Sequence, residues 1–203
     1  MELEKLTREV SPMLAFAAIS DESRAARRAS LPDEDLLLRI AREDKDAFCT
    51  LYEQTSGAVY AYALSLLRHS QDAEDVMQET FLKIRGAAHL YTPQGKPMAW
   101  ILTITRNLCM MRFRQQRRTA AVSVEAAAED PGFDRITDLE DRIVLKAALE
   151  SLTPEESRII ILHAVSGLKH RQIGELLDLP LSTVLSKYSR GLKKLRKELE
   201  GKL

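Results

Sequence analysis

Cysteine, glycine and proline are scarce in this chain of 203 residues, which contains two cysteines, eight glycines and seven prolines. Cys49 and Cys109 lie far apart and neither belongs to a CxxC motif, so nothing indicates a disulfide framework or a zinc knuckle. No apolar run approaches the ~20 residues that span a bilayer, and the acidic start does not have the form of an export signal. We therefore expect a protein of the reducing cytoplasm that does not insert into a membrane on its own.

A net charge is also missing, because 30 lysine and arginine residues balance 30 aspartate and glutamate residues at pH 7. The chain is 45% apolar and 30% charged, which is typical of soluble globular proteins with one large or two small cores. Leu, Ala, Glu, Lys and Arg are abundant, and straight-chain residues lose little rotamer freedom in a helix. The composition thus predicts an all-α protein.

The sequence contains no catalytic constellation. Its histidines have neither HExxH nor any other metal-ligand spacing, and we interpret them as structural or surface residues: His69, His89, His163 and His170. No nucleophile or phosphate-binding loop accompanies the carboxylates. We expect a protein that is not an enzyme and that has no catalytic residue, no metal site and no cofactor.

Helical periodicity is weak at the start of the chain and becomes strong at Leu31. Residues 1–30 have a short helical repeat followed by a polar stretch, which we interpret as a partly ordered extension in preference to a specific regulatory arm. Residues 31–118 are predicted to form a first helical domain. Its apolar residues recur at three- and four-residue spacings, as in core-facing helices: Leu37, Ile40, Phe48, Leu51, Tyr52, Val59, Tyr60, Ala63 and Leu67.

An acidic helix is predicted within HSQDAEDVMQETFLKIRGAAHLY. Ser70 is the expected N-cap, and carboxylates follow in the first turn, where they favour the positive end of the helix dipole. Asp72, Asp75 and Glu79 are spaced by three and four residues and so share one helix face, with Gln78 beside them. This face is either a solvated surface or a docking site for a basic partner.

A loop and a basic helix follow the acidic helix. The loop is TPQGKP, with two prolines and a glycine in six residues. The helix after it contains Trp100 in its apolar half and a run of arginines between residues 106 and 118. A tryptophan and arginines beside a loop could stack on unpaired bases, as in proteins that bind single strands. The alternatives are a core tryptophan and a solvated helix end.

The charge reverses between Thr119 and Asp141, where seven acidic residues accompany a single base. Like charges repel one another and extend the chain, so residues 119–139 are predicted to form a flexible acidic linker. Residues 140–203 are predicted to form a second helical domain.

A helix-turn-helix is predicted in the second domain. Thr153, Pro154 and Glu156 have the spacing of a capping box at a helix start. The short helix RQIGELL, the turn DLPL and a longer helix that Ser182 is expected to cap complete the motif. The outer face of the last helix is rich in hydroxyls and cations, which suits base edges and phosphates. The alternative is an ordinary solvated amphipathic helix.

Taken in order, these parts resemble the extracytoplasmic-function (ECF) class of bacterial RNA polymerase sigma factors. The resemblance lies in DAEDVMQETFLKI, in AWILTITRN with its basic tail, in the acidic linker, and in LTPEESRIIILHAVSGLKHRQIGELLDLPLSTVLSKYSRGLKKLR. It covers about residues 31–200. It implies an alternative sigma factor that binds core RNA polymerase and directs promoter-specific initiation by recognising promoter DNA and helping to melt it.

The resemblance assigns residues to three surfaces. It implies docking on core RNA polymerase by Asp72, Asp75, Gln78 and Glu79. It implies contact with the unwound minus-ten element of promoter DNA by Lys96, Trp100, Arg106, Asn107 and Arg112. It implies contact with the minus-thirty-five duplex by Arg171, Ser182, Thr183, Ser186, Lys187, Arg190 and Lys194. It also implies an anti-sigma factor as a further partner.

Several residues depart from the pattern of the class, which often has Asp where Met111 lies, Ala at Gly174, and Gly at Asp178 and Ser182. An aspartate can adopt a left-handed backbone at residue 178. Gly174 is expected to weaken its short helix by up to ~1 kcal/mol relative to Ala. Lys187 replaces a frequent Arg, so bidentate reading of guanine is lost there.

Two other functions remain open on the sequence. The first is a stand-alone helix-turn-helix transcriptional regulator that acts without docking on polymerase and binds a palindromic site tightly. The second is a helical interaction protein that never touches DNA.

Overall fold

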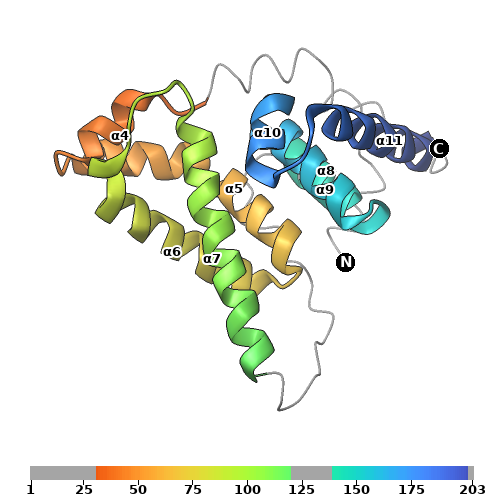
Figure 1. Cartoon of the computed structure of the whole chain (residues 1–203), viewed down its shortest axis with the longest axis horizontal. Coiled ribbons are helices and arrows are strands. Elements are labelled where there is room, and N and C mark those ends of the chain that lie inside the picture. Colours follow the sequence, from red (N-terminus) through yellow and green to blue (C-terminus); the bar gives the residue numbers. More distant parts are fainter. Residues whose placement is uncertain (1–30, 120–138, 201–203) are drawn as a thin grey trace. The chain divides into compact units, whose positions relative to one another are not determined.

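The computed structural model describes residues 31–119 and 139–200, and every regular element in these ranges is a helix (Figure 1). The described residues fall into two compact units, one with helices α4 to α7 and one with helices α8 to α11. This confirms the prediction of an all-α protein with two small helical domains. The predicted extension 1–30 lies outside the described residues, as does the predicted linker 119–139 except for its two end residues.

The first unit consists of α4 (Glu34–Ile40), α5 (Lys45–Leu67), α6 (Ser70–Ala87), the short 3-10 helix η1 (Ala88–Leu90) and α7 (Pro97–Thr119). Helices α5, α6 and α7 pack against one another, and α4 packs against both α5 and η1. Figure 1 shows α4 at the end of this unit where α6 ends and α7 begins. The first helix of the unit therefore lies next to the loop that connects η1 with α7.

The core of the first unit contains most of the residues that periodicity predicted. The predicted residues that are buried are Leu37, Ile40, Leu51, Val59, Tyr60 and Ala63. Tyr52 was predicted to face the core, and this is wrong, because 38% of its surface is exposed. Its ring lies at the edge of the core against Phe81 of α6, with the ring centroids 4.7 Å apart.

The start of α6 differs from the prediction by one residue. His69, and not Ser70, is the N-cap, and its Nδ1 atom accepts a hydrogen bond from the amide of Asp72 at 3.2 Å. The backbone of His69 is extended, which is the conformation that an N-cap requires. The Nδ1 atom of His69 thus accepts the capping hydrogen bond that was predicted for the hydroxyl of Ser70.

The second unit consists of α8 (Leu139–Ser151), α9 (Pro154–Ala164), α10 (His170–Leu177) and α11 (Leu181–Glu200), with α9 in contact with the other three helices. The predicted capping box at α9 is confirmed: the hydroxyl of Thr153 accepts from the amide of Glu156, and the Glu156 carboxylate accepts from the amide of Thr153. Pro154 occupies the first turn of the helix, as predicted.

The turn between α10 and α11 is made by a left-handed residue. Asp178 has φ 56° and ψ 44°, and its amide donates to the carbonyl of Gly174. The carbonyl of Pro180 accepts from the amides of Thr183 and Val184, so α11 begins at Leu181. The prediction that Ser182 caps this helix is therefore wrong, because the chain has already entered the helix when it reaches this hydroxyl.

Aromatic side chains join α9, α10 and α11 in the interior of the second unit. The rings of His163 and His170 stack with centroids 4.2 Å apart, and Tyr188 meets both of them edge-on. The Nδ1 atom of His163 lies 2.7 Å from the carbonyl oxygen of Leu168. These two histidines are structural residues, in agreement with their interpretation from the sequence.

Candidate nucleic-acid interface

The outer face of α6 carries the acidic residues predicted for docking. Asp75, Gln78 and Glu79 are exposed, whereas Asp72 is half-buried. The same face includes Leu82, of which 69% is exposed. Leu82 was not among the residues predicted for docking, although its position four residues after Gln78 and three after Glu79 places it on this face. We call Asp75, Gln78, Glu79 and Leu82 the α6 surface.

Arg112 of α7 binds two of the predicted docking carboxylates. Its Nε atom lies 3.1 Å from Oδ1 of Asp72, and its Nη2 atom pairs with Oδ2 of Asp75. Gln116, one turn further along α7, donates to Oδ2 of Asp72 at 2.9 Å. The structure therefore joins a residue predicted to contact DNA with two residues predicted to contact polymerase, and this cluster fastens α7 to α6.

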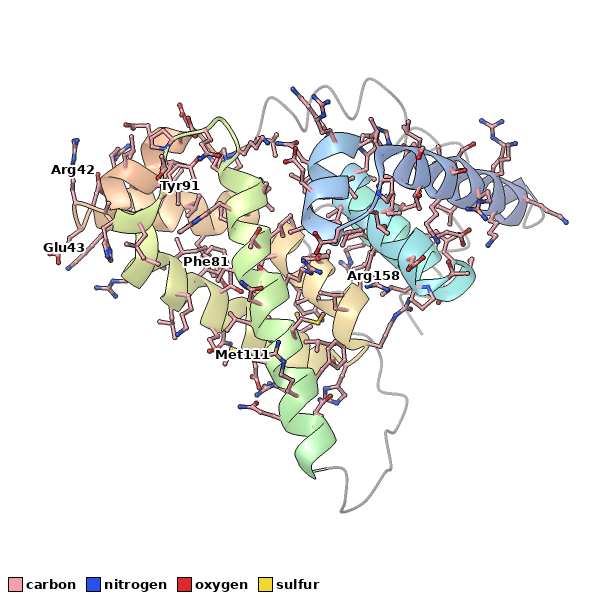
Figure 2. The ribbon with its side chains drawn as sticks, viewed as in Figure 1. Arg42, Glu43, Phe81, Tyr91, Met111 and Arg158 are labelled. Carbon is pink, nitrogen blue, oxygen red and sulfur yellow. The ribbon has the colours of Figure 1, made fainter. Side chains whose placement is uncertain are left out.

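The start of α7 is organised around the loop that precedes it. Tyr91, at the beginning of this loop, meets Trp100 edge-on with the ring centroids 5.3 Å apart. Figure 2 labels Tyr91 at the end of the unit where α4 approaches the loop. Lys96 and Trp100 are both half-buried, while Thr92, Pro93, Gln94 and Gly95 are exposed.

Further along α7 an exposed stripe faces solvent. It has three- and four-residue spacing and consists of Thr103, Asn107, Met111 and Arg114. Asn107 was predicted for this surface, whereas Arg106 is half-buried beside the stripe. Met111, which Figure 2 labels on this helix, is 49% exposed. We call these four exposed residues the α7 stripe.

The exposed face of α11 brings together most of the residues predicted for duplex DNA. Ser182, Ser186 and Arg190 are exposed at four-residue intervals, and Thr183 is half-buried beside them. Arg171 is exposed near the start of α10. Two exposed leucines on α11 were not singled out in the sequence, Leu181 and Leu185, with 44% and 46% of their surfaces exposed. We call Ser182, Ser186 and Arg190 the α11 stripe.

Two of the predicted DNA-binding lysines pair with carboxylates at the start of α9. Lys187 pairs with Glu155, and the Nζ atom of Lys194 lies 2.7 Å from Oε2 of Glu156. The Lys187 hydrogen bond holds the pKa of Glu155 below its ordinary value. Burial alone would raise the pKa of Glu156, but hydrogen bonds from Lys194 and Thr153 lower it. Both lysines thus tie α11 to α9.

The described residues offer no group of three or more His, Cys, Asp and Glu side chains that could hold a metal ion. Among the described helices, none has the length and apolar character needed to cross a bilayer.

Comparison with known families identifies both units. Residues 51–119 match the family described as Sigma-70 region 2, and residues 142–195 match Sigma-70, region 4. The first match covers α6 and α7, and the second covers α9, α10 and most of α11. The surfaces described above therefore lie within the matched ranges.

Curated relatives resemble the chain over most of its length. It is 31% identical over 172 residues to the ECF RNA polymerase sigma factor SigK of Mycobacterium sp. (strain KMS), a match that spans 81% of this chain and 89% of the relative. It is 30% identical over 180 residues to SigK of Mycobacterium tuberculosis (strain ATCC 25177 / H37Ra), which spans 85% and 96% of the two chains.

Two solved structures have a similar fold. The sigma factor RpoE in complex with the anti-sigma factor NepR from Bartonella quintana has a TM-score of 0.58 and 27% identity, with 77% of this chain and 98% of that chain covered. CnrH in complex with the cytosolic domain of CnrY has a TM-score of 0.56 and 22% identity, with 84% and 98% covered. The second likeness concerns the fold alone.

Proposed function

Because this chain belongs to the ECF class of RNA polymerase sigma factors, we propose that its two helical units divide promoter recognition between the minus-ten and minus-thirty-five elements. The protein is an alternative sigma factor that directs promoter-specific transcription. Members of this class are known as non-catalytic transcription factors, and we assign no catalytic residue to the chain. We place it in the cytoplasm, where core RNA polymerase and promoter DNA are found.

The α6 surface is the proposed docking site for core RNA polymerase. An exposed leucine among carboxylates and an amide offers an apolar anchor within a polar rim, which is the usual anatomy of a protein interface. Asp72 takes part indirectly, because it is half-buried and held by Arg112 and Gln116. Asp75 also pairs with Arg112, but it is exposed. The direct docking contacts are therefore assigned to Asp75, Gln78, Glu79 and Leu82.

The loop before α7, Lys96, Trp100 and the α7 stripe form the proposed surface for the unwound minus-ten strand. Opening a duplex loses stacking worth roughly 1–2 kcal/mol per base-pair step, so the captured bases need contacts that offset this loss. Trp100 is half-buried against Tyr91 and thus held in one orientation. Asn107 contributes a polar group to this surface, and Arg106 a nearby cation. Arg112 supports it from the α6 side.

The α11 stripe, with Arg171 and Thr183, is the proposed reader of the minus-thirty-five duplex. Hydroxyls near the start of a recognition helix can meet base edges, and cations further along can meet phosphates. Lys187 and Lys194 contribute positive potential while they are paired with Glu155 and Glu156. Arg190 is the exposed cation of the stripe.

The balance of 30 basic and 30 acidic residues fits this division of labour. A protein that bound DNA alone would need many phosphate contacts, each weakened by salt. When the sigma factor docks on polymerase, its DNA surfaces act at a high effective concentration, so modest contacts suffice. A neutral chain also avoids being held on random DNA.

An anti-sigma factor is the proposed regulatory partner. The support is that the solved neighbour RpoE is bound to the anti-sigma factor NepR. We propose that a protein of this kind restrains the present chain when its promoters are silent.

The match of both units to sigma-70 regions carries this proposal, and run-off transcription tests it. Purified bacterial core polymerase is mixed with a genomic promoter library, with and without the full-length chain. We expect new transcripts from particular promoters only when the chain is present. Failure of a folded, inhibitor-free preparation on the whole library would contradict the proposed function.

A further inference from the structure

A carboxylate from the first helix of the unit holds the loop before α7. The amides of Gln94 and Gly95 donate to Oε1 of Glu34 at 2.7 Å and 2.6 Å. The hydroxyl of Tyr91 donates to the same oxygen. Glu34 begins α4, and it precedes Gln94 by 60 residues in the sequence. One oxygen atom of α4 thus binds the loop both at its start, at Tyr91, and at its tip, at Gln94 and Gly95.

These hydrogen bonds hold the loop in one conformation, which the glycine at residue 95 permits. Gly95 has φ 68°, in the left-handed region, and successive amides around such a residue form a concave site for an anion. The Tyr91 hydrogen bond is the main reason that the pKa of Glu34 lies below its ordinary value, and the amides of Gly95, Gln94 and Lys96 add to it. Burial and the neighbouring carboxylate raise the pKa of Tyr91 to about 12. The pair therefore remains Glu⁻ and neutral Tyr across the physiological range.

Tyr91 extends the effect of Glu34 to Trp100. Its hydroxyl binds Glu34 while its ring meets the Trp100 ring edge-on, at a centroid distance of 5.3 Å. The carboxylate thus orders the loop directly and the tryptophan through one intervening side chain. At the same time, the side chains of Thr92, Pro93 and Gln94 are exposed, on the surface assigned to the unwound strand.

We propose that Glu34 is a positioning residue for capture of the unwound minus-ten strand, because it holds residues 91–96 and Trp100 in the arrangement that meets the bases. This inference rests on the proposed function of that surface. Glu34 itself does not contact DNA, because its carboxylate already accepts hydrogen bonds from the two amides and the Tyr91 hydroxyl. Its contribution belongs to strand opening and base preference, and the affinity for polymerase is independent of it.

The test compares Glu34→Ala, Glu34→Gln and the control Asp35→Ala in full-length protein. Asp35 is also acidic and lies in the same first turn of α4, but it is exposed. Each variant is assembled with core polymerase. Initiation is measured on promoters that the wild-type holoenzyme selects from a library randomised in the minus-ten element. Every promoter is used both as a duplex and with its minus-ten region opened beforehand by mismatches, and the affinity for core polymerase is measured separately.

We expect Glu34→Ala to lower initiation on duplex promoters about tenfold and on opened promoters less than threefold, with unchanged affinity for polymerase. Glu34→Gln can still accept hydrogen bonds with its amide oxygen, so it should lie between Glu34→Ala and wild type, and Asp35→Ala should match wild type. The preference for the selected base over its replacements should also weaken in Glu34→Ala. A merely structural role would lower initiation on all templates in the same proportion and would leave base preference intact.

Three results would overturn the inference: wild-type initiation by Glu34→Ala on duplex promoters, an equal loss on duplex and opened promoters, or a parallel loss of polymerase affinity. If the wild-type chain itself fails to initiate, the proposed function fails first, and the inference fails with it. A readout without polymerase completes the test. Amide hydrogen exchange of Gln94 and Gly95 should become at least tenfold faster in Glu34→Ala than in Asp35→Ala, and equal exchange in the two variants would contradict the anchoring contact.

Discussion

At the scale of single residues, ion pairs decide which cations are available to a partner. The sequence presents Arg112 as one arginine in a basic run, and the resemblance to ECF sigma factors implies that it contacts DNA. In the fold its guanidinium lies between Asp72 and Asp75 of α6. Its main effect is to hold α7 against α6. Loss of Arg112 should therefore lower the stability of the first unit more than it weakens DNA binding.

Arg112→Ala should lower the free energy of unfolding of the first unit by about 1 kcal/mol, because it leaves the half-buried Asp72 without its cation. Arg114→Ala removes an exposed charge from the same helix and should stay within about 0.5 kcal/mol of wild type. Urea unfolding followed by the fluorescence of Trp100, the single tryptophan, measures both changes. Equal stabilities of the two variants would mean that the ion pairs do not fasten α7 to α6.

Glu156 gives the second unit an acid-sensitive contact. Its pKa lies below the ordinary value of 4.5 because hydrogen bonds from Lys194 and Thr153 outweigh burial. A depressed carboxyl pKa contributes stability that is present above the unfolded pKa and is lost as the pH falls through the folded pKa. Glu156→Gln should therefore be less stable than wild type at pH 7, and the difference should shrink as the pH falls below about 4.5. Urea unfolding followed by circular dichroism between pH 7 and pH 3 tests this, and a constant difference would contradict it.

At the scale of elements, local signals located the helix ends to within a residue or two. The capping box of Thr153 and Glu156 was predicted correctly because its partners are three residues apart. The caps assigned to Ser70 and Ser182 were wrong, because His69 caps α6 and because α11 already begins at Leu181. Contacts of long sequence separation, such as Glu34 with Gly95, have no counterpart in local periodicity. For this reason local periodicity could predict which residues share a helix face, but not the residues from distant parts of the chain that hold that face in place.

Gly174 illustrates how packing can override helix propensity. Propensity alone predicts that Ala would strengthen α10. A Cβ atom at this position would lie 2.8 Å from the carbonyl oxygen of Leu179, which is too close for any side chain. In this conformation of the turn, the carbonyl of Leu179 lies so close to α10 that only glycine fits at residue 174.

Gly174→Ala should therefore destabilise the second unit by about 1–3 kcal/mol, the usual cost of forcing an extra carbon into a packed site. Gly57→Ala is the matched control, because a Cβ atom at this position in α5 meets nothing within 4 Å. It should stabilise the first unit by about 0.5–1 kcal/mol. Urea unfolding measures both, with circular dichroism for the second unit and Trp100 fluorescence for the first. A stabilising Gly174→Ala change would show that the turn relaxes without cost.

At the scale of the whole molecule, the neutral net charge is an average over segregated regions. Acidic residues occupy the α6 surface and the segment between Thr119 and Asp141, while cations gather on the later part of α7 and on α11. Three of these cations form ion pairs within their units: Arg112 with Asp72, Lys187 with Glu155, and Lys194 with Glu156. Other cations remain exposed on α11, among them Arg190, Lys193 and Lys197, and we expect these surfaces to read DNA together with polymerase.

The central claim is that the DNA-binding surfaces of this chain read a promoter only when the chain is bound to polymerase. The most direct measurement is the affinity of a fluorescent duplex promoter for the chain alone, for core polymerase alone and for the two together, at 150 mM salt. We predict weak, sequence-independent binding by either component and binding at least a hundredfold tighter, with clear promoter preference, by the assembled pair. Tight and specific binding by the chain alone, unchanged by polymerase, would contradict the account and favour a stand-alone helix-turn-helix regulator.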